Sequence, residues 1–384
     1  MNHLFTSEAV SEGHPDKVCD AISDAIVDLY LSYDTKSRTA IETMATTNQV
    51  IIAGETSSAI SVSHEQIENT VRQTIKKIGY EQDNFSWSDV NIQSYLHKQS
   101  ADIALGVDKL GAGDQGIMFG YAKKEADIDT EYMPMAIYLA NKILYELTCD
   151  RHNGSIKGIL PDAKSQITIE YDDNNNPIGL KKAVLSTQHE AWMSQEEIRD
   201  IACKYIKKAL PSNWSIDNAD ILINPTGRFV IGGPDGDTGL TGRKIIVDTY
   251  GGYAPHGGGA FSGKDPTKVD RSAAYMLRYI AKNIVAAGLA DECTLQISYA
   301  IGVAEPLSLY INTHNTSKID NQKLLKTIHE MFDLTPAGII KHLKLQNPIY
   351  LPTSSYGHFG RKPSDDNLFT WEKTDFAEEL KKCF

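Results

Sequence analysis

The sequence predicts an α+β fold of three related domains, each with helices laid on one face of a sheet. The chain has 384 residues, 41% hydrophobic and 23% charged, and at about 100–200 residues per domain this length gives two or three domains. The order helix, hairpin, helix occurs three times, at intervals too long for a solenoid. Such units suit α+β domains. Chance similarity of element order is the alternative explanation.

The first repeat begins with a helix over residues 17–33, where Val18, Ile22, Ile26 and Leu29 have helical spacing. The later elements follow from the same kind of pattern. They are strands 39–43 and 50–53 and helix 64–78; then helix 133–148, strands 165–171 and 180–187 and helix 194–209; then helix 267–287, strands 293–300 and 306–312 and helix 320–332.

Composition narrows the class of protein. Thirty-eight basic and 50 acidic residues give a net charge of −12, which argues against a nucleic acid or an anionic membrane as partner. No apolar run approaches the roughly 18–20 residues of a membrane span, and the N-terminus lacks the basic and apolar regions of a signal peptide. Five scattered cysteines without a CxxC pattern indicate reduced thiols in a cytoplasmic protein.

The glycine-rich stretch 257–272 is the most informative part of the chain. Its glycines let backbone amides approach a phosphate, and its lysines neutralise the charge. Residues from Gly258 to Lys264 fit G-x-x-x-x-G-K, but Asp265 stands where a P-loop needs Ser or Thr for its metal. Aspartates can hold Mg²⁺ instead. The stretch therefore predicts a polyphosphate site that is not that of a P-loop NTPase.

Three more glycine-rich loops, at 13–17, 111–116 and 232–239, accompany this stretch. Catalytic residues concentrate on loops held by rigid scaffolds, so the four loops indicate one composite site. A purely structural role remains open for several of these residues and their neighbours. Asp16 and Asp270 suit a helix start, Glu42 and Glu55 suit a strand surface, Lys164 is unremarkable alone, and His256 suits a turn.

Four cations favour a functional role instead, because they interrupt glycine-rich loops and do not lie on a helix surface. They are Arg243, Lys244, Lys264 and Lys268.

Seven motifs in order resemble those of one enzyme family. They are Gly-His-Pro-Asp-Lys at 13–17, Gly-Ala-Gly-Asp-Gln-Gly at 111–116, Asp-Ala-Lys-Ser-Gln at 162–166, Asn-Pro-Thr-Gly-Arg-Phe at 224–229, Gly-Gly-Pro-Asp-Gly-Asp at 232–237, Thr-Gly-Arg-Lys at 241–244 and His-Gly-Gly-Gly-Ala-Phe-Ser-Gly-Lys-Asp at 256–265. The chain closely resembles bacterial S-adenosylmethionine synthetase (methionine adenosyltransferase) from about Leu4 to Asp375.

The resemblance implies three domains with pseudo-threefold symmetry, each a mixed sheet covered by helices, expected here at 2–100, 113–230 and 232–373. It implies a cytoplasmic enzyme that joins ATP and L-methionine and then cleaves the released tripolyphosphate to pyrophosphate and phosphate. Its members use Mg²⁺, two per site expected here, and K⁺. They share each active site between two subunits, and the pairing of dimers into a homotetramer is expected by analogy.

The resemblance also implies residue roles. For ATP, His14 would lie by the leaving oxygen, the phosphates would be bound by Lys164, Arg243, Lys244 and Lys264, and further contacts would come from Asp162, Arg228, Phe229, Asp237 and Ala260. Methionine would be held by Glu55, Gln99, Asp237 and Lys268. Mg²⁺ would be held by Asp16 and Asp270 and K⁺ by Glu42, and Asp114 is a further active-site aspartate.

Two segments depart from the family's pattern. The gating segment 101–110 is shorter than in many relatives and has Ala101 where Pro is usual, which bears on kinetics and loop order. The segment 361–368 resembles a surface insertion and receives no role.

Two other function classes compete with the synthetase. A phosphotransferase would pass on only the γ-phosphoryl group and would need a base near an acceptor hydroxyl, yet no HRD-like or Walker B pattern occurs. A nucleotide sensor without turnover would have lost a key group, yet His14, Asp16, Lys164, Lys264 and Asp270 are all present. Adenosylation rather than ADP release separates the first alternative from the synthetase.

Overall fold

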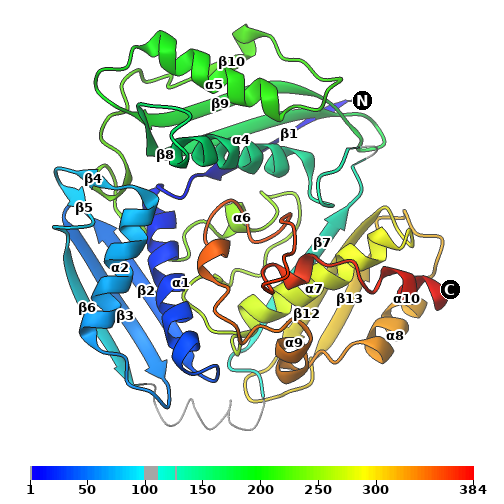
Figure 1. Ribbon diagram of the computed structural model, residues 1–384. Helices are drawn as coiled ribbons and strands as arrows, with labels where there is room; N and C mark the ends of the chain where they lie inside the picture. The colour runs from blue at the N-terminus through cyan, green and yellow to red at the C-terminus, as the bar shows by residue number, and fades with distance from the viewer. Residues whose placement is uncertain (1, 99–110, 126–127) are drawn as a thin grey trace.

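The computed structural model describes residues 2–98, 111–125 and 128–384 (Figure 1). It confirms the threefold order of helix, hairpin and helix. The three units are α1 (Pro15–Tyr33), β2 (Arg38–Thr46), β3 (Gln49–Ser57) and α2 (His64–Ile78); α4 (Met135–His152), β8 (Ile159–Tyr171), β9 (Pro177–His189) and α5 (Gln195–Ala209); and α7 (Val269–Ala286), β12 (Glu292–Tyr299), β13 (Ser308–Asn312) and α8 (Asn321–Met331). The α+β class with three related domains is confirmed.

Each hairpin belongs to a larger sheet, which is completed by strands from elsewhere in the chain. The sheets have the orders β1-β8-β9-β10, β11-β2-β3-β6 and β13-β12-β7. The added strands are β1 (His3–Val10), β6 (Asn91–Lys98), β7 (Gly116–Lys123), β10 (Ile221–Ile223) and β11 (Gly239–Leu240). In all three sheets the first hairpin strand pairs antiparallel with a remote strand, which is β11, β1 or β7.

These added strands cross the expected boundaries 2–100, 113–230 and 232–373, which stay a prediction. β1 comes from the first segment and lies in the sheet of the second, while β7 comes from the second and lies in the sheet of the third (Figure 1). The remaining described elements are β4 (Glu81–Gln82), β5 (Phe85–Ser86), α6 (Ile245–Asp248), α9 (Pro336–His342) and α10 (Ala377–Lys382), with short 3-10 turns.

Side-chain capping explains where several helices begin. Ser63 and Ser194 each accept a hydrogen bond from the backbone of the third helical residue, in capping boxes that start α2 and α5. The expected start of the first helix at Lys17 is wrong by two residues. The helix begins at Pro15 because proline suits the first helical position, and His14, not Asp16, is its N-cap.

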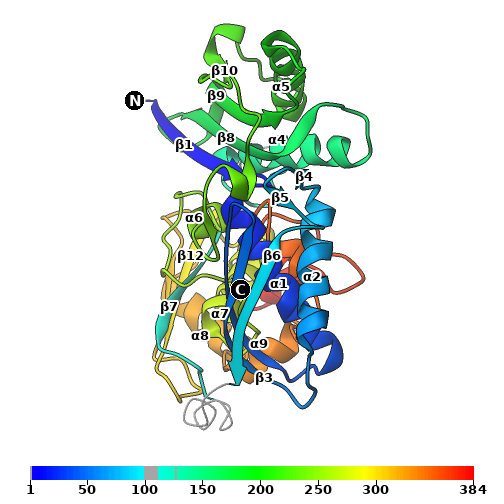
Figure 2. The same ribbon diagram turned by 90° about the vertical axis from the view of Figure 1, so that its left-hand side faces the viewer.

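Helices cover one face of each sheet (Figures 1 and 2), and the opposite face carries exposed side chains. Because strand side chains alternate, the exposed rows can be read from the register. They contain Leu4, Lys164 and Leu222 in the first sheet, Glu42, Glu55 and Tyr95 in the second, and Ile117 and Tyr310 in the third. Within the described part of the chain, no helix is long and apolar enough to cross a membrane.

Candidate active site

The loop that starts α1 and the loop at 240–244 form a first group of site residues. The carboxylate of Asp16 is buried and accepts a hydrogen bond from the backbone N–H of Leu240 at 3.0 Å. Lys244 donates to Asp16 Oδ2, and Arg243 Nη1 lies 3.7 Å from Oδ1. Gly239 permits this approach, since a Cβ there would lie 2.0 Å from the carbonyl oxygen of Pro15. The group therefore combines one buried anion with two cations.

His14 is neutral in this group. Burial and the charge of Lys244 lower its pKa from 6.5 to about 3. Its Nδ1 accepts a hydrogen bond from the backbone N–H of Asp16 at 3.1 Å, so the proton of the neutral ring sits on Nε2. His14 can therefore donate a hydrogen bond to an anionic oxygen and adds no charge of its own.

The start of β8 brings Asp162 beside the loop at 232–233. Asp162 Oδ2 accepts a hydrogen bond from Gly233 N–H at 2.8 Å, and burial raises the pKa of this carboxyl to about 7. Gly233 has φ +62°, and a Cβ there would lie 2.1 Å from the hydroxyl of Tyr80. Two residues along the strand, Lys164 lies on the exposed face, 3.1 Å from Glu8.

The glycine-rich stretch 257–270 forms a second group. Lys264 Nζ lies 2.6 Å from Asp270 Oδ2, in the first turn of α7. Gly259 packs on this carboxylate, since a Cβ there would lie 2.3 Å from Asp270 Oδ1. Gly116 approaches the same oxygen, at 3.5 Å from its ideal Cβ position. Half-buried Ala260 follows Gly259 in the loop.

Asp265 differs in role from the residue that a P-loop would have there. It is fully buried, and both of its oxygens are occupied. Oδ2 accepts from Thr39 N–H at 2.7 Å and from Lys268 Nζ at 2.6 Å, while Oδ1 accepts from Thr267 N–H at 2.8 Å. Asp265 thus ties the loop to β2 and pairs with Lys268.

The four predicted cations therefore fall into two places within one chain. Arg243 and Lys244 bond to Asp16, whereas Lys264 and Lys268 bond to Asp270 and Asp265. Among the described residues, no ion pair joins the group of the first two cations to that of the last two. The predicted cations of one chain thus form two ion-paired groups, which are called here the two halves of the candidate site.

The other predicted residues lie more loosely. Arg228, Asp237 and Asp114 are exposed, and Phe229 is half-buried, with its N–H bonded to His189 Nε2 at 3.1 Å. Glu55 lies 3.5 Å from His97 on the exposed face that also carries Glu42. Gln99, Ala101 and the gating segment 101–110 lie outside the described residues.

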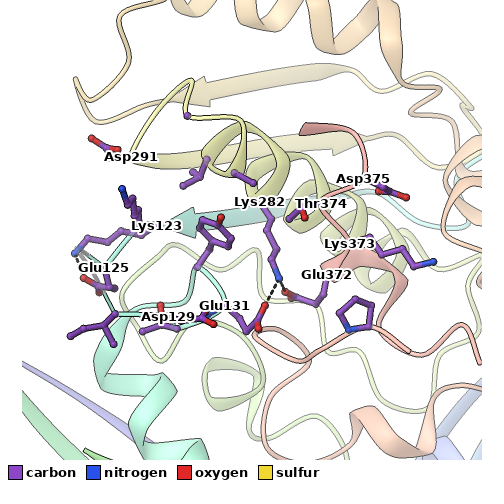
Figure 3. Close-up of a pocket in the computed structure, with 18 residues that line it drawn as sticks. Lys123, Glu125, Asp129, Glu131, Lys282, Asp291, Glu372, Lys373, Thr374 and Asp375 are labelled. Atoms are coloured by element: carbon purple, nitrogen blue, oxygen red, sulfur yellow. Dashed lines mark hydrogen bonds and ion pairs between the residues drawn. The ribbon is translucent and has the colours of Figure 1, made fainter. Parts of the chain in front are cut away.

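A cavity of about 980 Å³ lies apart from these loops, between the end of β7, the second half of α7 and residues 372–375 (Figure 3). Several of its charged residues form ion pairs: Lys282 lies 3.1 Å from Glu131 and 2.7 Å from Glu372, and Lys123 lies 3.1 Å from Glu125. None of the predicted site residues lines it among those described.

Sequence reasoning missed the buried charges that support the two halves. Lys17 pairs with Asp20 at 2.8 Å and with Asp248, and Asp24 pairs with Arg271 at 2.7 Å. Lys17, Asp20 and Asp24 share one face of α1 by their spacing. The signal that could have revealed them is the presence of charged residues on the helix face that also carries the apolar residues of α1.

Metal ligands of a closed protein cage are absent from the described residues, which hold no group of three or more His, Cys, Asp and Glu side chains suited to a metal. Mg²⁺ often uses only one or two carboxylates together with substrate phosphates. Asp16 and Asp270, each beside a lysine, fit that kind of open site.

The chain is similar to known proteins over nearly its whole length. Profiles described as the N-terminal, central and C-terminal domains of S-adenosylmethionine synthetase match residues 2–101, 109–229 and 231–373. S-adenosylmethionine synthase 2 of Rhodopseudomonas palustris strain BisB18 is 59% identical over 100% of this chain and 99% of its own length. The S-adenosylmethionine synthase of Parvibaculum lavamentivorans is 56% identical over 99% and 98%. The chain belongs to the S-adenosylmethionine synthetase family, whose activity is that of a methionine adenosyltransferase.

Proposed function

We propose that the chain joins ATP and L-methionine by in-line displacement at C5′ of ATP. A lone pair of the thioether sulfur forms the S–C5′ bond, and the C5′–O bond breaks with its electron pair going to the triphosphate. The sulfur has no proton to lose, so no general base is needed. Water then cleaves the tripolyphosphate to pyrophosphate and phosphate. The observation that carries this proposal is the pair of aspartate–lysine contacts, Asp16–Lys244 and Asp270–Lys264, on glycine-rich loops.

Catalysis then depends on orientation and on charge stabilisation at the leaving group. Orientation can contribute roughly 7–11 kcal/mol, and preorganised electrostatics are usually the largest single contribution. Lys244 and Lys264 each pair with an aspartate of the proposed site, so both ammonium groups already lie within it. Neutral His14 would donate from Nε2 to the leaving oxygen, and Arg243 and Lys164 would bind further phosphate oxygens.

Mg²⁺ would be held by Asp16 and Asp270, two ions per site, together with the phosphates. The ion supplies positive charge to the triphosphate when bound. The fit rests on the donor set, since each carboxylate is now paired with a lysine that phosphate oxygens could attract away. K⁺ would lie at Glu42, on the exposed face of β2. Burial raises the pKa of its carboxyl, and the positive charge of Lys264 opposes that shift.

Substrate contacts follow the same two halves. Asp162, Arg228, Phe229, Asp237 and Ala260 would contribute to ATP binding, with Phe229 offering a ring face to adenine. Glu55, Asp237 and Lys268 would hold methionine by its amino and carboxylate groups, together with Gln99. The contact of Lys268 Nζ with Asp265, at 2.6 Å, supports this role because it limits the positions of the ammonium group. Asp114 would serve as a further acidic group in the site.

We also propose a homodimer with shared active sites, in which each half-site meets the complementary half of a second copy. Glu42, Glu55 and Lys164 all lie on exposed sheet faces. The face of the second sheet also carries Tyr95, 61% exposed, and the exposed face of the third sheet carries Tyr310, 53% exposed. Large exposed side chains of this kind mark interaction surfaces. Pairing of dimers into a tetramer and a cytoplasmic location complete the proposal; the five cysteines are free thiols.

The test is incubation of the protein with ATP, L-methionine, Mg²⁺ and K⁺, with products followed by mass. Methionine-dependent S-adenosylmethionine, matched by equal amounts of phosphate and pyrophosphate, is expected. Omission of methionine is the control. Release of ADP would favour the phosphotransferase, and intact ATP beside a folded protein would favour the sensor.

A further inference from the structure

The turn that presents Lys264 is fastened by a buried ion pair. Arg271, in the first turns of α7, and Asp24, in α1, are both 0% exposed. Their contact is bidentate, with Nη1 2.7 Å from Asp24 Oδ1 and Nη2 3.0 Å from Oδ2. Nη1 of the same guanidinium also donates to the carbonyl oxygens of Phe261 and Lys264, each at 3.1 Å.

Asp24 and β2 hold the same turn from its other sides. Asp24 Oδ1 accepts a hydrogen bond from Gly263 N–H at 2.9 Å. The carbonyl oxygen of Gly263 accepts from Ile41 N–H at 2.9 Å. Gly263 has φ +82°, and a Cβ there would lie 2.0 Å from the carbonyl oxygen of Ile41. The backbone on both sides of Lys264 is therefore fixed by fully buried partners.

This arrangement sets the distance between two groups of the proposed site. Arg271 follows Asp270 directly in α7, so one helix carries both the carboxylate and the guanidinium that holds the lysine's backbone. Lys264 Nζ then reaches Asp270 Oδ2 at 2.6 Å. We infer that Asp24 and Arg271 are positioning residues for the reaction, which act by fixing Lys264 against Asp270. The inference rests on the proposed function of Lys264.

The same helix offers a matched control. Arg278 is also 0% exposed and also pairs with a carboxylate in a bidentate manner, with Nε and Nη2 each 2.9 Å from the oxygens of Glu372. It also donates to backbone carbonyls, including that of Tyr121 at 2.8 Å. Glu372 lines the cavity of Figure 3 and not the turn of Lys264. Arg278 thus repeats the chemistry of Arg271 away from the site.

The experiment compares Arg271→Lys with Arg278→Lys in the full-length protein. Lysine keeps the charge and loses the planar fork that serves several acceptors. We expect similar losses of Tm in the two variants. We expect kcat for S-adenosylmethionine formation to fall about 10²-fold in Arg271→Lys, since small misplacements of catalytic groups cost that much. In Arg278→Lys the change should stay within about threefold, and KM values should change little in both.

Hydrogen exchange of the turn adds a readout that does not depend on the reaction. The amides of 261–264 should exchange faster in Arg271→Lys than in Arg278→Lys. The inference would be overturned if the two variants lost equal amounts of kcat at equal losses of Tm. It would also be overturned if the amides of 261–264 exchanged as slowly in Arg271→Lys as in Arg278→Lys. If the wild-type protein makes no S-adenosylmethionine but the exchange differs as expected, the proposed function fails and the fastening of the turn stands.

A milder variant covers the case in which Arg271→Lys does not fold. Thr353 Oγ1 accepts a hydrogen bond from Arg271 Nη2 at 2.9 Å, and among the described residues Thr353 makes no hydrogen bond to Lys264 or Asp270. Thr353→Val should speed exchange of 261–264 and lower kcat, and Thr353→Ser should restore both. Failure of serine to restore them, or no effect of valine, would count against the positioning role.

Discussion

Replacement of Lys264 by alanine tests the central electrostatic claim. The Lys264 side chain is 23% exposed and lies 2.6 Å from Asp270. Its backbone contacts to Arg271 and Phe261 survive the substitution, so the turn should keep its shape. Two unit charges about 4 Å apart interact by about 4 kcal/mol at an effective dielectric constant of ~20. Loss of one preorganised contact typically costs about 10²–10³ in kcat, and 4 kcal/mol corresponds to about 10³.

The assay is steady-state formation of S-adenosylmethionine at saturating ATP and methionine, with KM measured for each. We expect kcat for Lys264→Ala to fall by about 10²–10³ with modest changes in KM, because the contact strengthens as charge builds on the leaving group. Lys381→Ala, an exposed lysine of α10 (Ala377–Lys382), is the control and should be silent. A fall in kcat of less than tenfold, or a loss confined to KM, would refute the role assigned to Lys264.

Three further predictions concern pH, local stability and assembly. The pKa of Asp162 is about 7 in the folded protein against 3.8 in the unfolded chain, so the folded protein keeps a proton that the unfolded chain loses, and stability falls as pH rises between about 4 and 7. Asp162→Asn should therefore have a higher Tm than wild type at pH 7.5 but not at pH 4. The same difference in Tm at both pH values would contradict this. Asp265→Asn should lower the free energy of unfolding by about 1–3 kcal/mol, because a buried N–H loses its acceptor and Lys268 loses its partner; urea denaturation measures it. The double variant Ile117→Asp with Tyr310→Asp should be a monomer with little activity, and light scattering measures its mass. A fully active monomer would exclude a site shared between subunits.

Much of the fold was predictable because its hairpins and helices are local. Helix 64–78 was predicted with the bounds that α2 has, since its serine cap and its apolar spacing agree. Strands β1, β7 and β11 escaped prediction. Each is paired with a partner far away in the sequence, and periodicity within a short window carries no information about such partners. The helical start at Pro15 was missed because the capping group is a histidine.

The candidate site was predictable as a set of residues and not as an arrangement. The motifs contain His14, Asp16, Lys244 and Lys264, and the glycine-rich stretch contains Asp270. In the structure Asp16 contacts both His14 and Lys244, and Lys264 contacts Asp270. Their division between two places depends on tertiary packing, which no motif expresses. The clamp of Asp24 and Arg271 was hidden for a similar reason, because each is an ordinary helix residue until the other helix is in place.

The exchange of strands between sheets has a consequence for how the chain folds during synthesis. β1 leaves the ribosome first, yet Val10 pairs with Lys164 of β8, so the N-terminal strand must wait for much of the chain before it finds its place. Leu240 of β11 likewise reaches Met44 of β2 only after the second helix–hairpin–helix unit has been synthesised. Non-local pairing of this kind slows folding and prolongs the exposure of unpaired edges. A nascent chain of this protein should therefore depend on chaperones until its C-terminal third is complete.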